Sequence, residues 1–324
     1  MARRWVAAAG TVAIALAAVA VFTYVSDHRP LRADSRDQPA PSHSGGSPTP
    51  TQQAKPARPG PVLAVKIDNA AAARPQTGID QADVLYVERV EAGITRFCAV
   101  FSSHLPDAIG PVRSARETDL DLLRQYENPV LAYSGAQGKL KPYIRKAPLR
   151  PMPPEKLSGY FRGGNRPAPH NLYLRTADAL KEAPEIGTPQ DLGFDRGPAP
   201  AGGKATPSRT VRFPAARYAF DWKSGGWQVS MDGTPSSTAA GKRLAPPNVV
   251  IQEVDIRKGG FGDRWGNNSP YTETVGEGDA TVLRDGKAYP VRWERPEADA
   301  ITKYETADGK PMRFAEGQVW VVYV

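Results

Sequence analysis

Residues 82–103 read ADVLYVERVEAGITRFCAVFSS, and this stretch indicates how the protein builds its core. Two strand-like runs lie on either side of a short turn at Ala92 and Gly93, which is the pattern of a β-hairpin. In the second run, Phe97 falls on one face and Val100 on the other, so both faces carry apolar side chains. We therefore expect a central strand that is covered on both sides.

Regular elements are predicted on both sides of this hairpin. A helix should begin at Ser114-Ala115-Arg116-Glu117, which has the form of a capping box, and should run to about Tyr126. The further strand-like runs are residues 61–69, 129–135 and 171–175, and a second helix is expected over residues 176–183.

A Gly/Pro-rich break over residues 187–208 divides the folded part of the chain. Before it we expect an α+β domain, residues 61–190, with a mixed central sheet and helices. After it we expect a β-rich C-terminal domain, residues 208–324, in which Asp285-Gly286 predicts a hairpin. The fold class predicted for the whole chain is α+β.

The N-terminus has the signature of an export segment. Two arginines precede an uncharged run over residues 5–25, which is long enough to cross a bilayer as a helix. We expect residues 1–25 to be a signal anchor in the cell membrane, with the rest of the chain on the extracytoplasmic side. The alternative is a signal peptide cleaved near Ala18-Val19-Ala20, which would give a secreted protein. Residues 26–60, rich in Pro and Ser, are expected to form a disordered linker.

The charge balance favours anionic partners. The chain has 42 Lys and Arg against 34 Asp and Glu, a formal net charge of +8. Outside a cell this excess favours an anionic wall polymer or a lipid headgroup, and no nucleic acid is expected. Between Glu127 and Asp178 a single acid, Glu155, stands among the basic residues Lys139, Lys141, Arg145, Lys146, Arg150, Lys156, Arg162, Arg166 and Arg175.

Common catalytic and metal-binding signatures are missing from the sequence. There is no HExxH, CxxC or GxSxG motif and no GxGxxG after a strand, and neither a cofactor nor a metal is expected. Cys98 is the one cysteine, so no disulfide can form within the chain and no cysteine follows the apolar segment for lipidation. The folded region holds His104 and His170, too few histidines for a His-rich metal site.

Polar residues gather near the predicted hairpin and helix. An anion site is suggested at Ser114, because N–H groups at a helix N-terminus attract anions and Arg113 and Arg116 would add forked donors. Turns, helix capping and a structural ion-pair network are the alternatives for the same residues. The ligand-binding candidates are Asp68, Asn69, Arg74, Glu88, Glu91, Arg96, Arg113, Ser114, Arg116, His170 and Asn171.

Four ordered motifs carry a resemblance to a known family. KIDN (66–69), GITRF (93–97), GPVRSAR (110–116) and APHNLY (168–173) resemble the YerB-type lipoprotein family of bacterial envelope proteins. That family is classed as a domain of unknown function and has a β-rich C-terminal domain. The resemblance implies an α+β fold and an envelope location, and it implies no known reaction. Here an apolar segment replaces the family's lipidated cysteine.

Two functional hypotheses follow. The first is a binding or scaffold module that recognises an anionic envelope ligand or an envelope protein partner. The alternative is a hydrolase or transferase acting on envelope polymers, with Glu88 or Glu91 as acid or base. Strand alternation places these two carboxylates on opposite faces, which weakens the alternative. Convergence of the candidate residues in one pocket would favour a specific site.

Overall fold

The predicted hairpin forms the centre of the main sheet. The structure is a computed structural model that describes residues 60–186, 189–262 and 266–324. In it, β2 (Val84–Arg89) and β3 (Thr95–Phe101) pair antiparallel around a 3-10 turn, η3 (Glu91–Gly93). The other edge of β3 pairs with β1 (Leu63–Asp68), and every residue of β3 is buried. The prediction of a central strand covered on both faces is confirmed.

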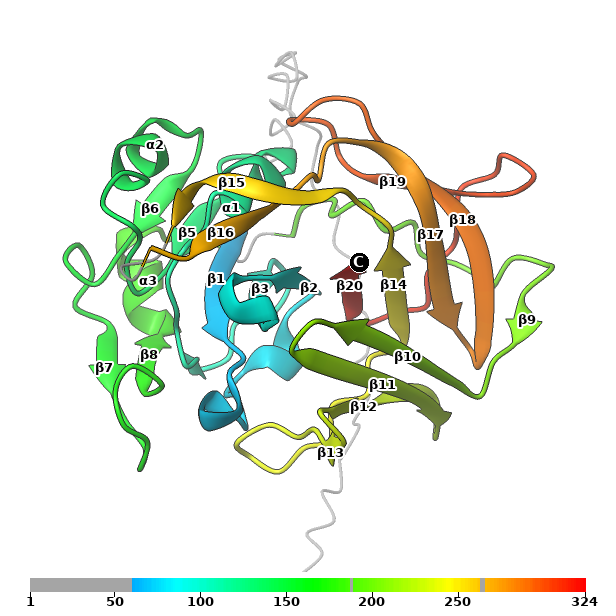
Figure 1. Ribbon diagram of the computed structural model, residues 1–324, viewed down its shortest axis with the longest axis horizontal. Helices are drawn as coiled ribbons and strands as arrows, with labels where there is room; N and C mark the ends of the chain where they lie inside the picture. Colours follow the sequence, from blue (N-terminus) through cyan, green and yellow to red (C-terminus); the bar gives the residue numbers. More distant parts are fainter. Residues whose placement is uncertain (1–59, 187–188, 263–265) are drawn as a thin grey trace, which may run out of the picture. The chain divides into compact units, whose positions relative to one another are not determined.

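The main sheet continues from the hairpin into the C-terminal half of the chain (Figure 1). Its order is β19-β18-β17-β14-β20-β2-β3-β1-β5-β6, with β9 beside β18. The sheet is mixed, because the last strand, β20, runs parallel to both β14 and β2. The bounds are β5 Val130–Ala132, β6 Arg150–Met152, β9 Lys204–Ala205, β14 Asn248–Gln252, β17 Gly276–Arg284, β18 Lys287–Arg295, β19 Lys303–Thr306 and β20 Val319–Tyr323.

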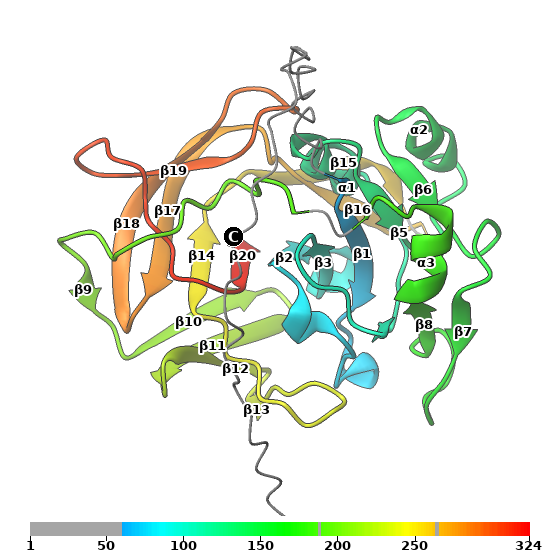
Figure 2. The same cartoon turned by 180° about the vertical axis from the view of Figure 1, so that it is seen from behind.

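Three smaller sheets surround the main one. A four-stranded sheet contains β10 (Ser208–Phe213), β11 (Ala216–Lys223), β12 (Gly226–Met231) and β13 (Thr234–Pro235). A three-stranded sheet contains β4 (Ala108–Ile109), β8 (Leu172–Arg175) and β7 (Tyr160–Arg162). The two strands β15 (Ile256–Gly262) and β16 (Asn268–Thr272) form a ribbon that crosses α1 (Thr118–Leu122), as Figures 1 and 2 show.

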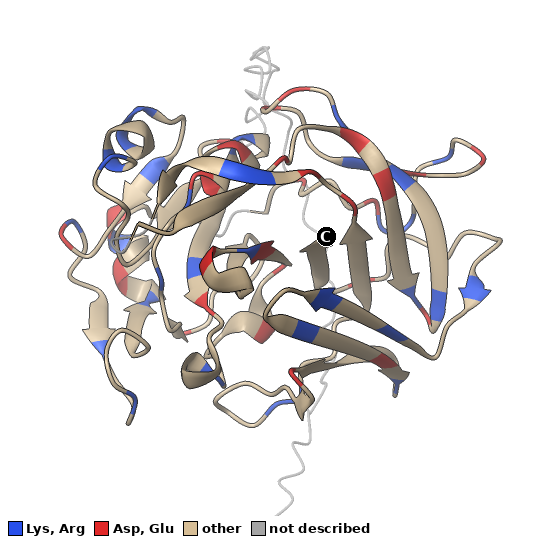
Figure 3. Ribbon diagram, viewed as in Figure 1, with Lys and Arg blue, Asp and Glu red and all other residues tan. Residues whose placement is uncertain are grey.

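The helices are short and occur in the N-terminal half of the described residues. Besides α1 they are α2 (Lys141–Lys146) and α3 (Thr176–Glu182), with 3-10 turns η1 (Ala71–Ala73), η2 (Ile79–Gln81) and η4 (Leu123–Gln125). The prediction of a helix over 176–183 is confirmed by α3. The exposed face of α2 is basic, with Lys141, Arg145 and Lys146 (Figure 3). The described residues are thus β-rich with mixed sheets, and the α+β class holds only loosely.

The predicted capping box does not form. Helix α1 begins at Thr118, and neither Ser114 nor Glu117 makes a side-chain cap to it. The loop before it is held by the rest of the fold, because Arg113 N donates to Lys66 O at 2.8 Å and Ala115 N to Gly135 O at 3.0 Å. These long-range bonds keep the segment extended, so the local capping motif loses to tertiary contacts.

Two hydrophobic cores lie on the two faces of the main sheet. Strand alternation sends Phe97 and Phe101 of β3 to one core and Cys98 and Val100 to the other. The first core is shared with β11 and β12 of the four-stranded sheet, and the second with α1. Trp320 of β20 packs edge-on against Phe97 at 5.7 Å between ring centroids, so the two halves of the chain share a core.

The described residues form one compact unit around this shared sheet. The predicted hairpin at Asp285-Gly286 is present between β17 and β18. No helix of the described residues is long and apolar enough to span a membrane. The predicted anchor, residues 1–25, lies outside the described residues, as does the predicted linker apart from Gly60.

Candidate functional site

A cleft of about 1010 Å³ opens beside the turn between β2 and β3. Its walls come from that turn, the loop before α1, the loop before β8 and the β15–β16 ribbon. Six of the predicted candidates line it together: Glu91, Arg96, Arg113, Ser114, Arg116 and His170. Residues that are up to 79 positions apart in the sequence therefore meet at one surface.

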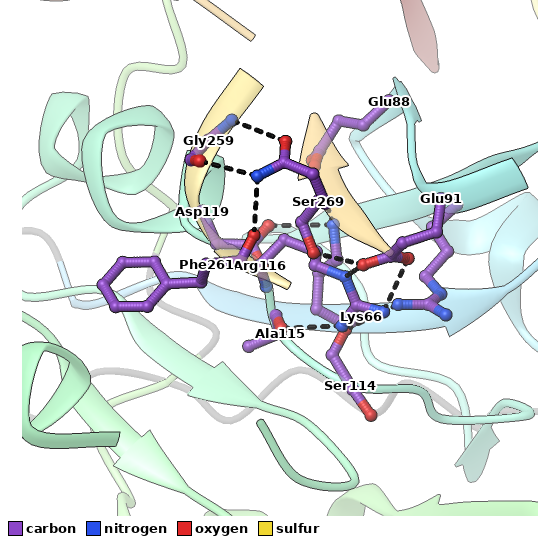
Figure 4. Close-up of polar contacts among 12 residues, drawn as sticks. Lys66, Glu88, Glu91, Ser114, Ala115, Arg116, Asp119, Gly259, Phe261 and Ser269 are labelled. Carbon is purple, nitrogen blue, oxygen red and sulfur yellow. Dashed lines mark hydrogen bonds and ion pairs between the residues drawn. The ribbon is translucent and has the colours of Figure 1, made fainter. Parts of the chain in front are cut away.

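Arg116 and Glu91 form a two-pronged ion pair on one wall of the cleft (Figure 4). Nε of Arg116 lies 2.7 Å from Oε1 of Glu91, and Nη2 lies 2.8 Å from Oε2. Ser269 on β16 donates a further hydrogen bond to the same carboxylate. Burial acts to raise the pKa of Glu91, but the hydrogen bonds and charge of Arg116 outweigh it and lower the pKa. Glu91 is therefore an ionised structural partner and a poor proton donor.

Arg96 lies deeper and is the least satisfied cation of the cleft. Its side chain, on β3, is only 7% exposed. Nη1 reaches the carbonyl of Ser114 at a long 3.4 Å, while Nε has no hydrogen-bond partner among the residues that the structure describes. Burial, and then the nearby charge of Arg116, lowers the pKa of Arg96 to about 9, so the group is still protonated at pH 7. Such a buried cation without a salt bridge costs stability unless a ligand pairs with it.

Asp68, at the end of β1, connects two further lining residues. Its Oδ2 lies 3.2 Å from Nε of Arg113 and 2.9 Å from Nδ1 of His170, while Oδ1 accepts the N–H of Ala70. The Asp68 side chain is 3% exposed, so it lies beneath the cleft surface. It orients the guanidinium and the imidazole that line the cleft.

A fully buried ion cluster fixes the loop that carries Arg113 and Arg116. Nζ of Lys66 lies 2.9 Å from Glu88 and 2.8 Å from Asp119, and none of the three side chains is more than 1% exposed. The other oxygen of Asp119 accepts the backbone N–H of Arg116 at 2.6 Å. The cluster thus joins β1, β2 and α1 and holds the arginine loop against the sheet (Figure 4).

The cluster contains two carboxylates and one ammonium group, and this imbalance shifts the pKa values of its members. Burial acts to lower the pKa of Lys66, but the charges of Asp119 and Glu88 outweigh it and raise the pKa. Burial raises the pKa of Glu88 to about 7 despite the opposing effect of Lys66. Cys98 also presents its sulfur within 4.8 Å of both carboxylates, but Lys66 already supplies the cation there.

The raised pKa of Glu88 predicts that stability falls as pH rises from about 4.5 to 7. In this window the unfolded carboxyl ionises while the folded one retains its proton, so the folded state loses up to about 1.4 kcal/mol per pH unit. Glu88→Gln should flatten this dependence and be more stable than the parent at pH 8. Urea unfolding at four pH values measures it, with the exposed Glu297→Gln as control. If the free energy of unfolding of Glu88→Gln depends on pH as steeply as that of the parent, the proton is bound by another group.

The other predicted residues do not line the cleft. Asn69 donates to Tyr218 Oη at 2.6 Å and accepts from Arg74, whose Nη1 pairs with Asp232 at 2.7 Å. This network joins the segment after β1 to the four-stranded sheet. Asn171 bonds Arg162 at 2.7 Å within its own loop. Glu88 is buried against Lys66 and does not line the cleft, where an acid or base for the alternative hypothesis would have to act.

The backbone N–H groups around Ser114 that were expected to help hold an anion are largely occupied. The N–H groups of Arg113, Ala115 and Arg116 are all used within the protein, by Lys66, Gly135 and Asp119. Helix α1 has only five residues and makes no side-chain cap. The anion-binding capacity of this segment therefore lies in its arginine side chains.

Sequence reasoning missed the ribbon that closes one side of the cleft. Phe261 and Ser269 line the cleft from β15 and β16, and Gly260 N donates to Glu117 at 2.7 Å. Ser269 is 178 positions away from its partner Glu91. Neither residue belongs to a polar motif, and no local signal connects the ribbon to the hairpin.

Comparisons with known proteins agree on one family. A similar protein is the putative lipoprotein YerB of Bacillus subtilis (strain 168), 26% identical over 275 residues that cover 80% of each chain. The crystal structure of Bacillus subtilis YerB matches with a TM-score of 0.68 and 22% identity, over 82% of this chain and 91% of that one, and shows the same fold.

Two family models match the chain. The N-terminal domain of a protein of unknown function, DUF3048, matches residues 46–188, and the C-terminal domain matches residues 209–321. These matches confirm the resemblance that GITRF and GPVRSAR indicated. The chain belongs to the DUF3048 family of proteins of unknown function.

Proposed function

We propose that this protein is an extracytoplasmic binding protein whose cleft holds an anionic group of a cell-envelope ligand. The observation that carries the proposal is Arg96, a buried guanidinium that lines the cleft without a salt bridge among the described residues. A carboxylate or phosphate placed against it would supply the missing acceptor and charge.

The neighbouring side chains suit the same ligand. Arg113 and Arg116 line the cleft beside Arg96, and their ion pairs with Asp68 and Glu91 orient them in advance. Pre-oriented guanidinium groups lose little entropy when they bind a planar or tetrahedral anion. Three guanidinium groups and two carboxylates, Glu91 and Glu117, line the cleft, and the carboxylate of Asp68 lies beneath it against Arg113.

The surroundings would guide an anion toward this cleft. Leu140 and Gly138 line it just before α2, and the exposed face of α2 carries the basic residues seen in Figure 3. Fields of this kind raise the rate at which anionic ligands arrive and weaken at high salt.

An envelope location supports the choice of ligand. The relative from Bacillus subtilis is named a putative lipoprotein, which fits attachment to the outer side of a membrane. In this chain the apolar residues 5–25 would serve as the anchor in place of a lipid, or as a signal peptide that is removed. Wall polymers and lipid headgroups are the abundant anions there.

Arg113→Lys should weaken binding of a small anion by about tenfold, because it keeps the charge and removes the fork. Calorimetric titration of the protein with galacturonic acid and with inorganic phosphate, at low and high salt, measures this. Arg209→Gln, an exposed arginine on β10, is the matched control and should bind like the parent. A general basic face would instead lose affinity steeply with salt and barely respond to Arg113→Lys, because the lysine keeps the charge.

Arg96→Met provides a second readout of the same site. Binding should be lost, while the free energy of unfolding without ligand should rise by about 1 kcal/mol or more, because a buried cation without a salt bridge is removed. Destabilisation by Arg96→Met would instead show that Arg96 is structural. If neither small anions nor phosphatidylglycerol vesicles bind the parent protein, the anion site fails and a protein partner becomes the leading ligand.

A hydrolase or transferase acting on envelope polymers is the second candidate function. The hydrogen bond from His170 Nδ1 to Asp68 orients the imidazole and leaves Nε2 for proton transfer in the cleft, where Ser114 is a further lining group. Breakdown of purified wall glycan by the protein, lost in His170→Gln, would favour this candidate. Binding without product would favour the first.

A further inference from the structure

A second cleft adjoins the first and shares lining residues with it. It has a volume of about 700 Å³ and is lined by residues from the β6–β7 connection and β7. Arg113, Ser114 and Pro169 line both clefts, so the two meet at the arginine loop. Each volume alone is in or near the range of a pocket for a complete small ligand, roughly 300–1,000 Å³. The pair is therefore larger than one small anion requires.

We propose that the two clefts form one groove that binds a linear glycan carrying carboxylate or phosphate groups along its length. This inference rests on the proposed anion site in the first cleft and names the class of its ligand. A lone headgroup or free phosphate would fill one cleft and leave the other without a partner. A chain lying across Arg113 would occupy both.

Positive charge is present in both halves of the groove. Arg113 lies where the clefts meet, and Arg162 lines the second cleft, where its guanidinium is held by Asn171 at 2.7 Å. Glu155 is the carboxylate of the second cleft and lies on its rim, exposed to solvent. Arginines spaced along a groove match a polymer whose negative charges repeat.

Aromatic side chains in both halves favour a sugar polymer over a simple polyanion. Phe261 lines the first cleft and packs edge-on against Tyr143 at 5.3 Å, and Tyr143 is 58% exposed. Tyr160 and Phe161 line the second cleft. Flat aromatic surfaces offer apolar contact to the C–H faces of sugar rings, which a chain of phosphates alone cannot use.

The experiment titrates the whole extracytoplasmic protein with oligogalacturonates of one to eight units. Affinity should rise with length by tenfold or more, beyond the gain expected from the number of equivalent units, and then level off once the groove is filled. Arg162→Gln and Tyr143→Ala should each lower the affinity for the longest oligogalacturonates at least threefold. Neither substitution should change the affinity for galacturonic acid. Arg209→Gln should behave like the parent.

Three outcomes would overturn the inference. If the monomer binds but length adds nothing, the anion site stands and the polymer groove is wrong. If linear polyphosphate shows the same gain with length, the ligand is a polyanion and the sugar contacts are irrelevant. If neither the monomer nor any oligomer binds, the proposed function fails together with the groove.

Discussion

Replacing Lys66 with methionine should lower the free energy of unfolding at pH 7 by about 3–5 kcal/mol. The ammonium of Lys66 is the counter-ion of Glu88 and Asp119, at 2.9 and 2.8 Å, in a site closed to solvent. Without it, two carboxylates share a buried site with no cation between them. Urea unfolding followed by tryptophan fluorescence measures the loss.

A matched variant separates lost charge balance from lost packing. Lys66→Met combined with Glu88→Gln and Asp119→Asn removes every charge and should recover most of the stability, because neutral amides need no counter-ion. The single variant should also recover partly at pH 5, where the raised pKa of Glu88 keeps its carboxyl protonated. A triple variant no more stable than the single one would refute the electrostatic explanation.

The same cluster should matter for binding. Asp119 bonds Lys66 with one oxygen and the Arg116 backbone with the other, so the cluster fixes the loop that carries Arg113. In the triple variant the asparagine can still accept the Arg116 N–H. Anion binding is therefore expected to survive in the triple variant and to weaken in the single one, as a result of loop disorder.

Ending the chain after Gln318 should abolish cooperative folding. The removed strand β20 lies between β14 and β2, hydrogen-bonds to both and is buried at all five positions. Its loss would expose two strand edges and the core around Phe97. Circular dichroism and the absence of a sharp thermal transition would show it. Trp320→Ala, which costs about 3–5 kcal/mol, is the graded control.

The same strand decides whether the predicted domains are independent. Because β20 completes the sheet of the N-terminal half, residues 61–190 alone are expected to aggregate or remain unfolded. A nick in the exposed loop around Ala201 should be tolerated when both pieces remain together. A soluble, cooperatively folding 61–190 fragment would instead establish two separate domains.

The sequence by itself determined the elements whose signals are local. Alternation and apolar content located β1, β2 and β3, and turn chemistry located the hairpin at Asp285-Gly286, because these patterns depend on neighbours within a few residues. The motifs GITRF and GPVRSAR also contain four of the six candidate residues that line the cleft, since each motif supplies several nearby positions.

Only the tertiary structure decided what those residues do. The capping box at Ser114 gave way to hydrogen bonds that the loop donates to the carbonyls of Lys66 and Gly135, and two glutamates three positions apart received different partners. Glu88 lies against Lys66, and Glu91 lies against Arg116 because the chain turns after β2. The side chains that bury and charge each site come from segments far away in the sequence, such as the ribbon that carries Ser269. No local sequence pattern shows that these segments lie next to one another.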